Sequence, residues 1–540
     1  MAVDACMTLA EISALVLARA MSPVELTQAR ISRVERFDPQ LHAFITPTFE
    51  IALDQARRAE HEIAHGRWRG PFHGIPFGLK DIYDTAGIRT TAGSRLLMDR
   101  VPSEDAAVTV RLLDAGGALL GKLATHEFAI GGPSHDLPWP VPRNPWNTAH
   151  FVGGSSSGSA AAIAAGFVPA ALGSDTGASI RNPAALAGIA GLKPTFGLIS
   201  RRGVIPNAYS LDTCGPMART TEDCAILLNL LVGFDAADPC SIPTETQDYR
   251  AALTKDIRGL RIGVVRHFWE HDAPVDPQLA GAMEQAISTL GSLGARCEEV
   301  RLRPLRDYHD IRMLIGQSEL FANHHANLAT RSGEYGAEFL RKVLPAMLWT
   351  AIDYVQAQRE RRRMLEEFQP VYAKFDALVT AGAGPAARLD QYDGRSFWSK
   401  PNIYNAFNIS GGPALAVAIG FSSNGLPLGM QIASAPFRDA TVLRIGHAYE
   451  CATAWHTRRA PLESSESPTA IVATVDSTPA PDGPARIAID TAARRVGVAL
   501  DDRSLSMIGS VAPYALAMAE RLPRHRDFSL QPSTAFSFPR

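Results

Sequence analysis

The sequence predicts an α/β protein that carries a small helical segment at its C-terminal end. Segments with helical periodicity alternate with short apolar segments of strand length from Thr8 to Trp455, and this alternation is typical of folds in which helices are layered on a sheet. Apolar residues make up 46% of the 540 residues, which is enough for a large core. After Trp455 the composition changes, which indicates a boundary before the C-terminal segment.

The first part of the chain is expected to form helices and two strands. Ser22 followed by Pro23 gives one helix an N-cap with proline in the first helical position. The apolar residues before Lys80 predict a strand that ends on this lysine and is consistent with its burial. The expected elements of this part are helices at residues 8–20, 23–37, 51–65 and 106–115 and strands at residues 76–81 and 118–122.

A formal HExxH motif, the pattern of zinc proteases, ends the third helix between His61 and His65. The alternative is a solvent-facing helix end before Gly66, where histidine is favourable near the negative end of the helix. We favour this alternative, because charged residues crowd the segment and no third metal ligand suggests itself. We therefore expect neither a metal ion nor an organic cofactor.

Two loops dense in glycine and serine, at residues 153–159 and 173–181, dominate the centre of the chain. An alanine-rich segment separates them and is expected to form a helix at residues 159–165 and a strand at residues 170–172. Glycine reaches backbone conformations closed to other residues and lets a substrate approach closely. A serine nucleophile needs a base, and because neither loop contains histidine, a lysine base is the expected solution.

Several motifs, in their order along the chain, resemble those of the amidase signature family, which are serine hydrolases with a Ser–cis-Ser–Lys triad. The two Gly-Ser loops are similar to the family signature, and residues 74–81 are similar to its lysine segment. Further similar segments are residues 143–147, 407–414 and 425–431. The resemblance covers residues 8–458. It implies the amidase signature fold, a large mixed, mostly parallel sheet flanked by helices.

The resemblance implies a catalytic triad of Lys80, Ser155 and Ser179. Ser179 would be the nucleophile, neutral Lys80 the base, and Ser155 the bridge through which the proton passes. The family holds the bridging serine after a cis peptide bond, which here would join Gly154 to Ser155. Burial can lower the pKa of a lysine from about 10.4 far enough for the side chain to lose its proton near neutral pH.

The same resemblance places an oxyanion hole at the backbone N–H groups of residues 176–179, so that Thr176, Gly177 and Ala178 would bind the substrate. Such donors are often the largest contribution to catalysis, and each is worth about 3 kcal/mol. The sequence departs from the family at Ala178, where the family commonly has a second glycine. If this position needs a positive φ, alanine is strained, and its methyl group narrows the acyl pocket.

A competing motif lies in the first loop, where residues 154–158 match GxSxG, the nucleophile elbow of α/β-hydrolases, with Ser156 as the nucleophile. The elbow requires a buried strand directly before it. Residues 144–151 contain Pro, Trp, Asn and His and are not typical of one. We therefore expect Ser156, like Ser157 and Ser159, to hydrogen-bond loop backbone.

Other segments are expected to support the site or to line the substrate pocket. Asp175 should fix the second loop, and Arg181 should bind a neighbouring carboxylate or carbonyl group. The arginine-rich helix at residues 353–373 is typical of a solvated face. The segments expected to build the pocket are residues 128–134, 311–349 and 381–404.

The C-terminal part divides into a linker and a small helical unit. Residues 461–484 are rich in Ser, Thr, Pro, Ala and Asp and predict an extended linker between a domain at residues 1–460 and a segment at residues 485–540. Two amphipathic helices are expected in the segment, the second interrupted at Pro513. Their apolar faces would form a large exposed patch, and the segment is too small for its own core.

We therefore expect the segment to dock on an amidase domain, with Phe528, Phe536 and Phe538 as anchors. The linker permits docking on the same chain or exchange within a homodimer. Two helices with an extended aromatic tail also resemble the small C subunit of tRNA-dependent amidotransferases, here fused to the amidase.

The composition argues against several classes of partner. The formal net charge of −2 gives no indication of nucleic acid or of a membrane. The six cysteines show no CxxC spacing and fit a reducing cytoplasm. Residues 1–21 lack a basic segment and are expected to form an amphipathic helix rather than a signal peptide. We expect a cytoplasmic protein.

The expected function is that of a stand-alone amidase, which hydrolyses small-molecule linear amides through an acyl-enzyme on Ser179 and releases ammonia or an amine. The alternative is the glutaminase A-type subunit of a tRNA-dependent amidotransferase, which delivers ammonia to a partner. Ammonia release from glutamine, with and without a candidate partner subunit, distinguishes the two. A non-enzymatic scaffold is disfavoured, because Lys80, Ser155 and Ser179 are all present.

Overall fold

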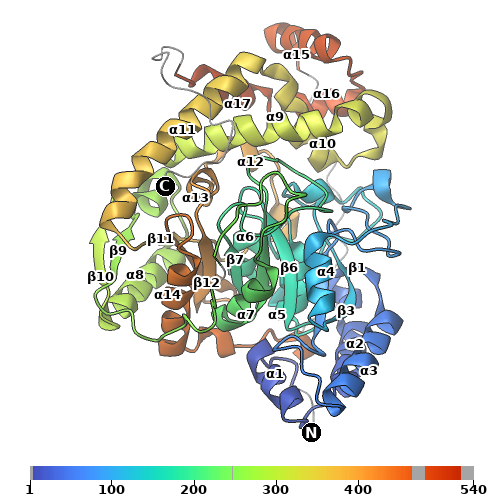
Figure 1. The fold of residues 1–540 in the computed structure, drawn as a ribbon. Coiled ribbons are helices and arrows are strands. Elements are labelled where there is room, and N and C mark those ends of the chain that lie inside the picture. The colour runs from blue at the N-terminus through green and yellow to red at the C-terminus, as the bar shows by residue number, and fades with distance from the viewer. Residues whose placement is uncertain (1–3, 246, 465–480, 524–540) are drawn as a thin grey trace.

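A computed structural model describes residues 4–245, 247–464 and 481–523 of the chain. Within these residues, one mixed sheet of eleven strands forms the centre, and helices pack around it (Figure 1). The strands of this sheet are β1 (Phe44–Pro47), β2 (Pro76–Lys80), β3 (Ala118–Leu123), β6 (Ala170–Asp175), β7 (Ala190–Lys193), β8 (Thr213–Ala218), β9 (Arg261–Val264), β10 (Arg296–Glu299), β11 (Ala377–Ala381), β12 (Ala414–Phe421) and β13 (Pro427–Ala433). The prediction of a large mixed sheet flanked by helices is confirmed.

The order of the strands brings the sequence motifs together. Along the sheet the order is β1-β3-β2-β6-β8-β7-β12-β13-β11-β9-β10. Strand β2 is parallel to β3 and β6, and β9 is parallel to β10 and β11, whereas β6, β8, β7 and β12 pair antiparallel. Because β2 and β6 are parallel neighbours, their carboxyl ends lie at the same edge of the sheet, and these ends carry Lys80 and Asp175.

The helices lie close to their predicted bounds. Helix α2 begins as expected, since Ser22 Oγ accepts hydrogen bonds from the second and third backbone N–H groups and Pro23 follows it. Among the described residues, none of the helices has the length and apolar character needed to cross a membrane. The helices before the C-terminal segment are α1 (Leu9–Leu17), α2 (Pro23–Leu41), α3 (Phe49–Ala64), α4 (Ala107–Asp114), α5 (Ser157–Ala164), α6 (Arg181–Ala187), α7 (Thr221–Leu231), α8 (Pro277–Ser292), α9 (Leu305–Arg331), α10 (Ala337–Val343), α11 (Ala351–Lys374), α12 (Ser396–Ser399), α13 (Asn405–Ile409) and α14 (Asp439–Ala452).

Two predictions about exposed helix surfaces have different outcomes. His61 and His65 are exposed at the end of α3, and the glutamate of the motif, Glu62, forms an ion pair with Arg69 at 2.6 Å. The solvent-facing interpretation of this helix end is confirmed. The prediction of a solvated arginine face on α11 is wrong for Arg361, which is buried, because α11 packs along α9.

The alanine-rich segment forms α5, and every residue of this helix is buried. A side chain on Gly158 would lie 2.3 Å from the backbone nitrogen of Ala124, so α5 reaches the end of β3 only because residue 158 has none. Ser159 Oγ donates to the carbonyl oxygen of Leu172 at 2.9 Å and ties α5 to β6. This close packing holds the first loop, at the start of α5, near the end of β2.

The C-terminal segment packs on its own chain as three short helices, α15 (Gly483–Val496), α16 (Asp502–Gly509) and α17 (Ala512–Glu520) (Figure 1). The predicted interruption of the second helix separates α16 from α17. Trp349 Nε1 donates to the carbonyl oxygen of Ala515 at 2.8 Å, and Arg521 forms an ion pair with Asp310 of α9. Docking is therefore confirmed for the described residues.

The remaining predictions for this part lie outside the described residues. Most of the predicted linker, residues 461–484, lies outside the described residues. The three proposed anchors Phe528, Phe536 and Phe538 also lie outside them. The division of the chain into residues 1–460 and 485–540 stays a prediction.

Docking of the C-terminal segment predicts that truncation of two of its isoleucines changes the free energy of unfolding by different amounts. Ile508 in α16 is fully buried, whereas Ile487 in α15 is 67% exposed. Ile508→Ala should lower the free energy of unfolding by about 2–5 kcal/mol, because it leaves a cavity, and Ile487→Ala should change it by less than about 0.5 kcal/mol. Thermal unfolding of the two variants is the measurement. Equal melting temperatures would contradict the packing of α16 on the main domain.

Candidate active site

The residues predicted to be catalytic meet at the carboxyl ends of β2 and β6. Lys80 is the last residue of β2, Ser155 precedes α5, and Ser179 lies in the loop between β6 and α6. The peptide bond between Gly154 and Ser155 is cis, as the resemblance implies. Ser156 N donates to the carbonyl oxygen of Ser179 at 3.2 Å, which joins the two Gly-Ser loops.

Lys80 is fully buried and contacts both loops. Its Nζ donates to Ser155 Oγ at 2.7 Å and to Ser174 Oγ at 2.9 Å. Burial lowers the pKa of Lys80 to about 7, and the negative charges of Asp175 and Asp212 only partly oppose this shift. A substantial fraction of the lysine is therefore neutral near pH 7, the state in which it can accept a proton. Sequence analysis missed Ser174, the second partner of this lysine.

Ser179 is the most accessible of the three residues. It is 8% exposed, whereas Lys80 and Ser155 are 0% exposed, as expected if Ser179 meets the substrate. Among the described residues, no hydrogen bond links Ser179 Oγ to Ser155. The transfer of a proton from Ser179 to Ser155 stays a prediction.

His126, which sequence analysis missed, packs against the cis peptide. A side chain on Gly154 would lie 2.1 Å from the imidazole, so only glycine fits there. Gly132 N donates to His126 Nδ1 at 2.7 Å, and burial with two nearby lysines holds the pKa of His126 well below its usual range. The one basic nitrogen of the neutral ring is therefore occupied, and His126 is not available as the base for a serine.

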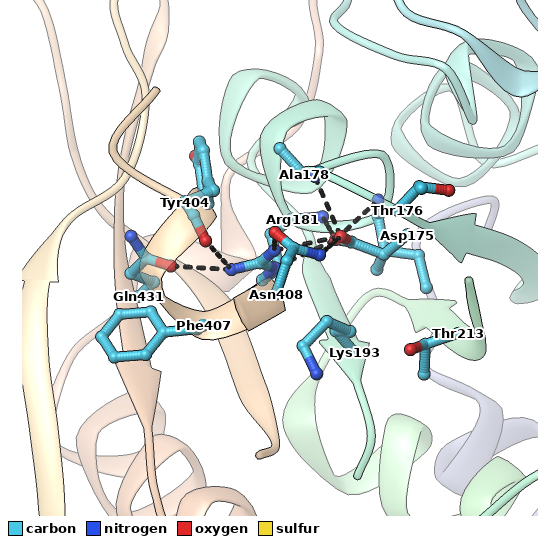
Figure 2. A network of polar contacts seen from close by, with 12 residues as sticks. Asp175, Thr176, Ala178, Arg181, Lys193, Thr213, Tyr404, Phe407, Asn408 and Gln431 are labelled. Atoms are coloured by element: carbon cyan, nitrogen blue, oxygen red, sulfur yellow. Dashed lines mark hydrogen bonds and ion pairs between the residues drawn. The ribbon is translucent and has the colours of Figure 1, made fainter. Parts of the chain in front are cut away.

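Asp175 and Arg181 anchor the second loop (Figure 2). The Asp175 carboxylate accepts hydrogen bonds from Ala178 N at 2.9 Å, from two nitrogens of Arg181 at 3.0 Å and from Asn408 Nδ2 at 2.8 Å. Burial alone would raise the pKa of Asp175, but the Arg181 guanidinium and these hydrogen bonds hold it well below its usual range. The predicted roles of Asp175 and Arg181 in fixing this loop are confirmed.

The oxyanion hole at residues 176–179 stays a prediction, and the structure shows which of its N–H groups are engaged within the loop. Ala178 N–H donates to Asp175 at 2.9 Å. The N–H groups of Gly177 and Ser179 donate to no other group among the described residues. Ala178 has a φ of 137°, a conformation that favours glycine, so the strain expected for an alanine here is present.

Ala178→Gly should relieve this strain. Strained backbone conformations of this kind cost about 1–3 kcal/mol. Relief of the strain is partly offset, because glycine gives the unfolded chain more conformational freedom and so stabilises the unfolded state. We expect a net gain in the free energy of unfolding of about 1 kcal/mol, measured by chemical denaturation. The matched change Ala280→Gly, in the regular helix α8, should instead destabilise by about 1 kcal/mol. A loss of stability in both variants would contradict strain at Ala178.

Three polar side chains from the expected pocket segments contact the second loop or the segment around Gly131. Lys342 of α10 is fully buried, and its Nζ contacts the carbonyl oxygen of Gly131 and, at 3.1 Å, Tyr392 Oη. Arg312 of α9 and Asn402 reach carbonyl oxygens of the second loop at 3.4 and 3.3 Å. No local motif marks these residues in the sequence.

The geometry opposes the competing nucleophile elbow. Residues of this segment form a strand, β5 (Asn147–Phe151), but as expected it is not the buried strand that an elbow requires. It pairs with β4 (Arg143–Asn144) in a separate two-stranded sheet. Ser156 is fully buried, and its hydroxyl accepts a hydrogen bond from Ser174 N at 3.3 Å. Ser156 therefore supports the loop backbone, as expected.

The motifs agree with a family assignment over most of the chain. Residues 25–443 match the model of the family described as Amidase. The chain belongs to the amidase family. This is the family that the lysine segment and the two Gly-Ser loops indicate.

Similar members of the amidase family include subunits of larger enzymes. The A subunit of glutamyl-tRNA(Gln) amidotransferase from Methylococcus capsulatus is 42% identical over 482 residues, which cover 84% of this chain and 98% of the relative. The structure of the same kind of subunit from Thermotoga maritima is 32% identical with a TM-score of 0.67 and covers 79% of this chain and 91% of that one. The structure of the native peptide amidase from Stenotrophomonas maltophilia is 31% identical with a TM-score of 0.73. The match covers 84% of this chain and 98% of that one.

These relatives correct two expectations. The expected stand-alone amidase for linear amides is contradicted, because the relatives at 36–42% identity carry the name of an amidotransferase subunit. The expectation of a small-molecule amide substrate and no nucleic acid is contradicted by the tRNA in that name. The expectation without nucleic acid rested on net charge, and a sum of charges over one chain does not test for partners.

Proposed function

We propose that this chain is the glutaminase A-type subunit of a tRNA-dependent amidotransferase. The observation that carries the proposal is the 42% identity to the A subunit of glutamyl-tRNA(Gln) amidotransferase over 98% of that relative. The buried Lys80–Ser155 pair supports an amide-cleaving site in the same chain. The substrate is then glutamine, and its hydrolysis yields glutamate and ammonia. The ammonia is transferred to a partner subunit, which binds the tRNA and uses the ammonia in amidation.

The proposed reaction begins with attack of Ser179 Oγ on the carboxamide carbon of glutamine. The proton of Ser179 passes to Ser155, and Ser155 passes its own to neutral Lys80, which its hydrogen bond of 2.7 Å allows. The tetrahedral oxygen is bound by the N–H groups of Gly177 and Ser179. The proton returns to the leaving nitrogen, ammonia departs, and a water molecule attacks the acyl-enzyme along the same route, which releases glutamate.

A cytoplasmic location is part of this proposal. The six cysteines are all free thiols, which suits a reducing compartment. The proposed action on tRNA would also take place in the cytoplasm.

The test measures glutamine hydrolysis in three mixtures. The first contains this chain without a partner, the second adds a candidate partner subunit, and the third adds that partner together with glutamylated tRNA. We expect slow ammonia release from the chain by itself and faster release in the complete mixture, with none from Ser179→Ala. The proposal fails if the chain hydrolyses other primary amides but leaves glutamine intact even with the partner and the tRNA present.

A further inference from the structure

Arg312 of α9 presents a buried positive charge to the second loop. The residue is 4% exposed. Its Nε donates to the carbonyl oxygen of Thr176 at 3.4 Å and its Nη1 to Gln317 Oε1 at 3.2 Å. Within the described parts of the chain, no carboxylate lies within ion-pair distance of this guanidinium. A buried charge is normally paired at close range, so the position of Arg312 against the carbonyl group of Thr176 calls for a functional explanation.

The guanidinium reaches the loop because residue 177 has no side chain. A Cβ on Gly177 would lie 2.7 Å from Arg312 Nε. On the following peptide, Asn402 Nδ2 donates to the carbonyl oxygen of Gly177 at 3.3 Å, while the N–H of that peptide, from Ala178, is held by Asp175 at 2.9 Å. The loop is therefore held through two successive carbonyl groups.

These contacts set the direction of the N–H groups. The peptide between Thr176 and Gly177 is trans, and in a planar trans peptide the C=O and N–H bonds point in opposite directions. Because the carbonyl oxygen of Thr176 faces Arg312, the N–H of Gly177 points away from it. That N–H has no other partner among the residues described.

We propose that Arg312 is a positioning residue of the oxyanion hole, which orients the N–H of Gly177 toward the developing oxyanion through the carbonyl group of Thr176, while Asn402 supports it by fixing the following peptide. The inference rests on the proposed role of Ser179 and its loop, but not on the identity of the partner subunit. It assigns to α9 and to the segment around residue 402 a part in the chemical step rather than in substrate binding.

The test measures the rate at which a fluorophosphonate phosphonylates Ser179, since this reaction builds charge on an oxygen in the same hole without needing the natural substrate. Arg312→Met removes the charge and the donors at similar volume and should slow labelling on the order of 100-fold. Arg312→Lys keeps the charge and should recover part of the rate. Arg306→Met, a change of the same kind on α9 at a residue that contacts Ser399, should label at the wild-type rate.

Hydrolysis of glutamine and of a neutral primary amide separates this role from substrate recognition. We expect Arg312→Met to lower kcat for both by a similar factor, with little change in KM. A loss confined to glutamine would overturn the proposal and make Arg312 a site for the substrate carboxylate. Labelling of Arg312→Met at the wild-type rate, with a wild-type melting temperature, would also overturn it. Absence of Ser179 labelling in the wild-type protein would instead refute the underlying reaction.

Discussion

Ser179→Ala should fold normally and lose carboxamide hydrolysis, by on the order of 10⁴- to 10⁶-fold as when a serine nucleophile is removed from other triads. The Ser179 hydroxyl lies in a loop and makes no hydrogen bond to Ser155 in the described structure, so its removal should change the free energy of unfolding by less than about 0.5 kcal/mol. Steady-state ammonia release and thermal unfolding measure the two effects. A fluorophosphonate should label the wild-type protein at Ser179 and leave the variant unlabelled.

The matched control is Ser156→Ala in the neighbouring loop. Ser156 is buried, and its hydroxyl bonds the backbone of Ser174, so its loss should lower stability by about 1 kcal/mol. The Ser156→Ala protein should still be labelled at Ser179 by the fluorophosphonate. A Ser179→Ala protein that is still labelled, at Ser156, would reject the triad and restore the nucleophile elbow.

Lys80→Met should abolish turnover to a similar extent, and the wild-type rate should depend on pH through this lysine. Burial lowers the pKa of Lys80 to about 7 from a usual value of 10.5. The neutral fraction that accepts the proton therefore increases as pH rises through about 7, and kcat/KM should rise with pH and then level off. The measurement is kcat/KM for glutamine from pH 5.5 to 9, roughly the span over which such a group titrates.

A second buried lysine must be separated from Lys80 in that profile. Burial also lowers the pKa of Lys193 to about 7, and its Nζ donates to backbone carbonyl oxygens at Pro194 and Gly412. Lys193→Gln should keep the pH midpoint of kcat/KM, whatever its effect on stability. A midpoint that moves with Lys193 while Lys80→Met stays active would contradict the assignment of the base.

The lowered pKa of Lys80 also makes the stability of the fold depend on pH. Between about pH 7 and 10.5 the folded protein leaves Lys80 neutral, whereas the unfolded chain protonates it. The unfolded state binds more protons there, so the contribution of Lys80 to the free energy of unfolding increases with pH. Lys80→Met should remove this dependence and be more stable than the wild type at and below pH 7, as measured by denaturation at several pH values.

Features that depend on a few neighbouring residues could be predicted from the sequence. The end of β2 at Lys80 and the clamp between Asp175 and Arg181 belong to short motifs whose residues lie close together in the chain. The cis bond before Ser155 was implied by the family resemblance. The end of β6 was placed three residues too early, since the strand extends to Asp175. The start of α2 at Ser22 and Pro23 is likewise local, because a cap and a fixed φ act within one turn.

The parts that could not be predicted come from packing between distant segments. His126, Arg312 and Asn402 reach the loops from elements far apart in the sequence, and nothing in their own surroundings distinguishes them from ordinary polar residues. Arg361 was expected in solvent because charged neighbours surround it, yet α11 lies along α9 and buries it. The composition could also not point to the proposed partner subunit, since the chain carries no marked net charge.

The covalent attachment of α15, α16 and α17 changes the thermodynamics of their docking. A separate small protein present at nanomolar abundance would need nanomolar affinity to stay bound, or about 12 kcal/mol of binding free energy. For a segment joined to its site by the predicted linker of about 20 residues, we expect an effective concentration in the millimolar range. Contacts worth little more than about 4 kcal/mol then suffice, and occupancy does not fall on dilution. The surface formed by α9 and α10 is therefore covered once per chain at any protein concentration, and a second molecule of the same segment supplied in trans has little site left to bind.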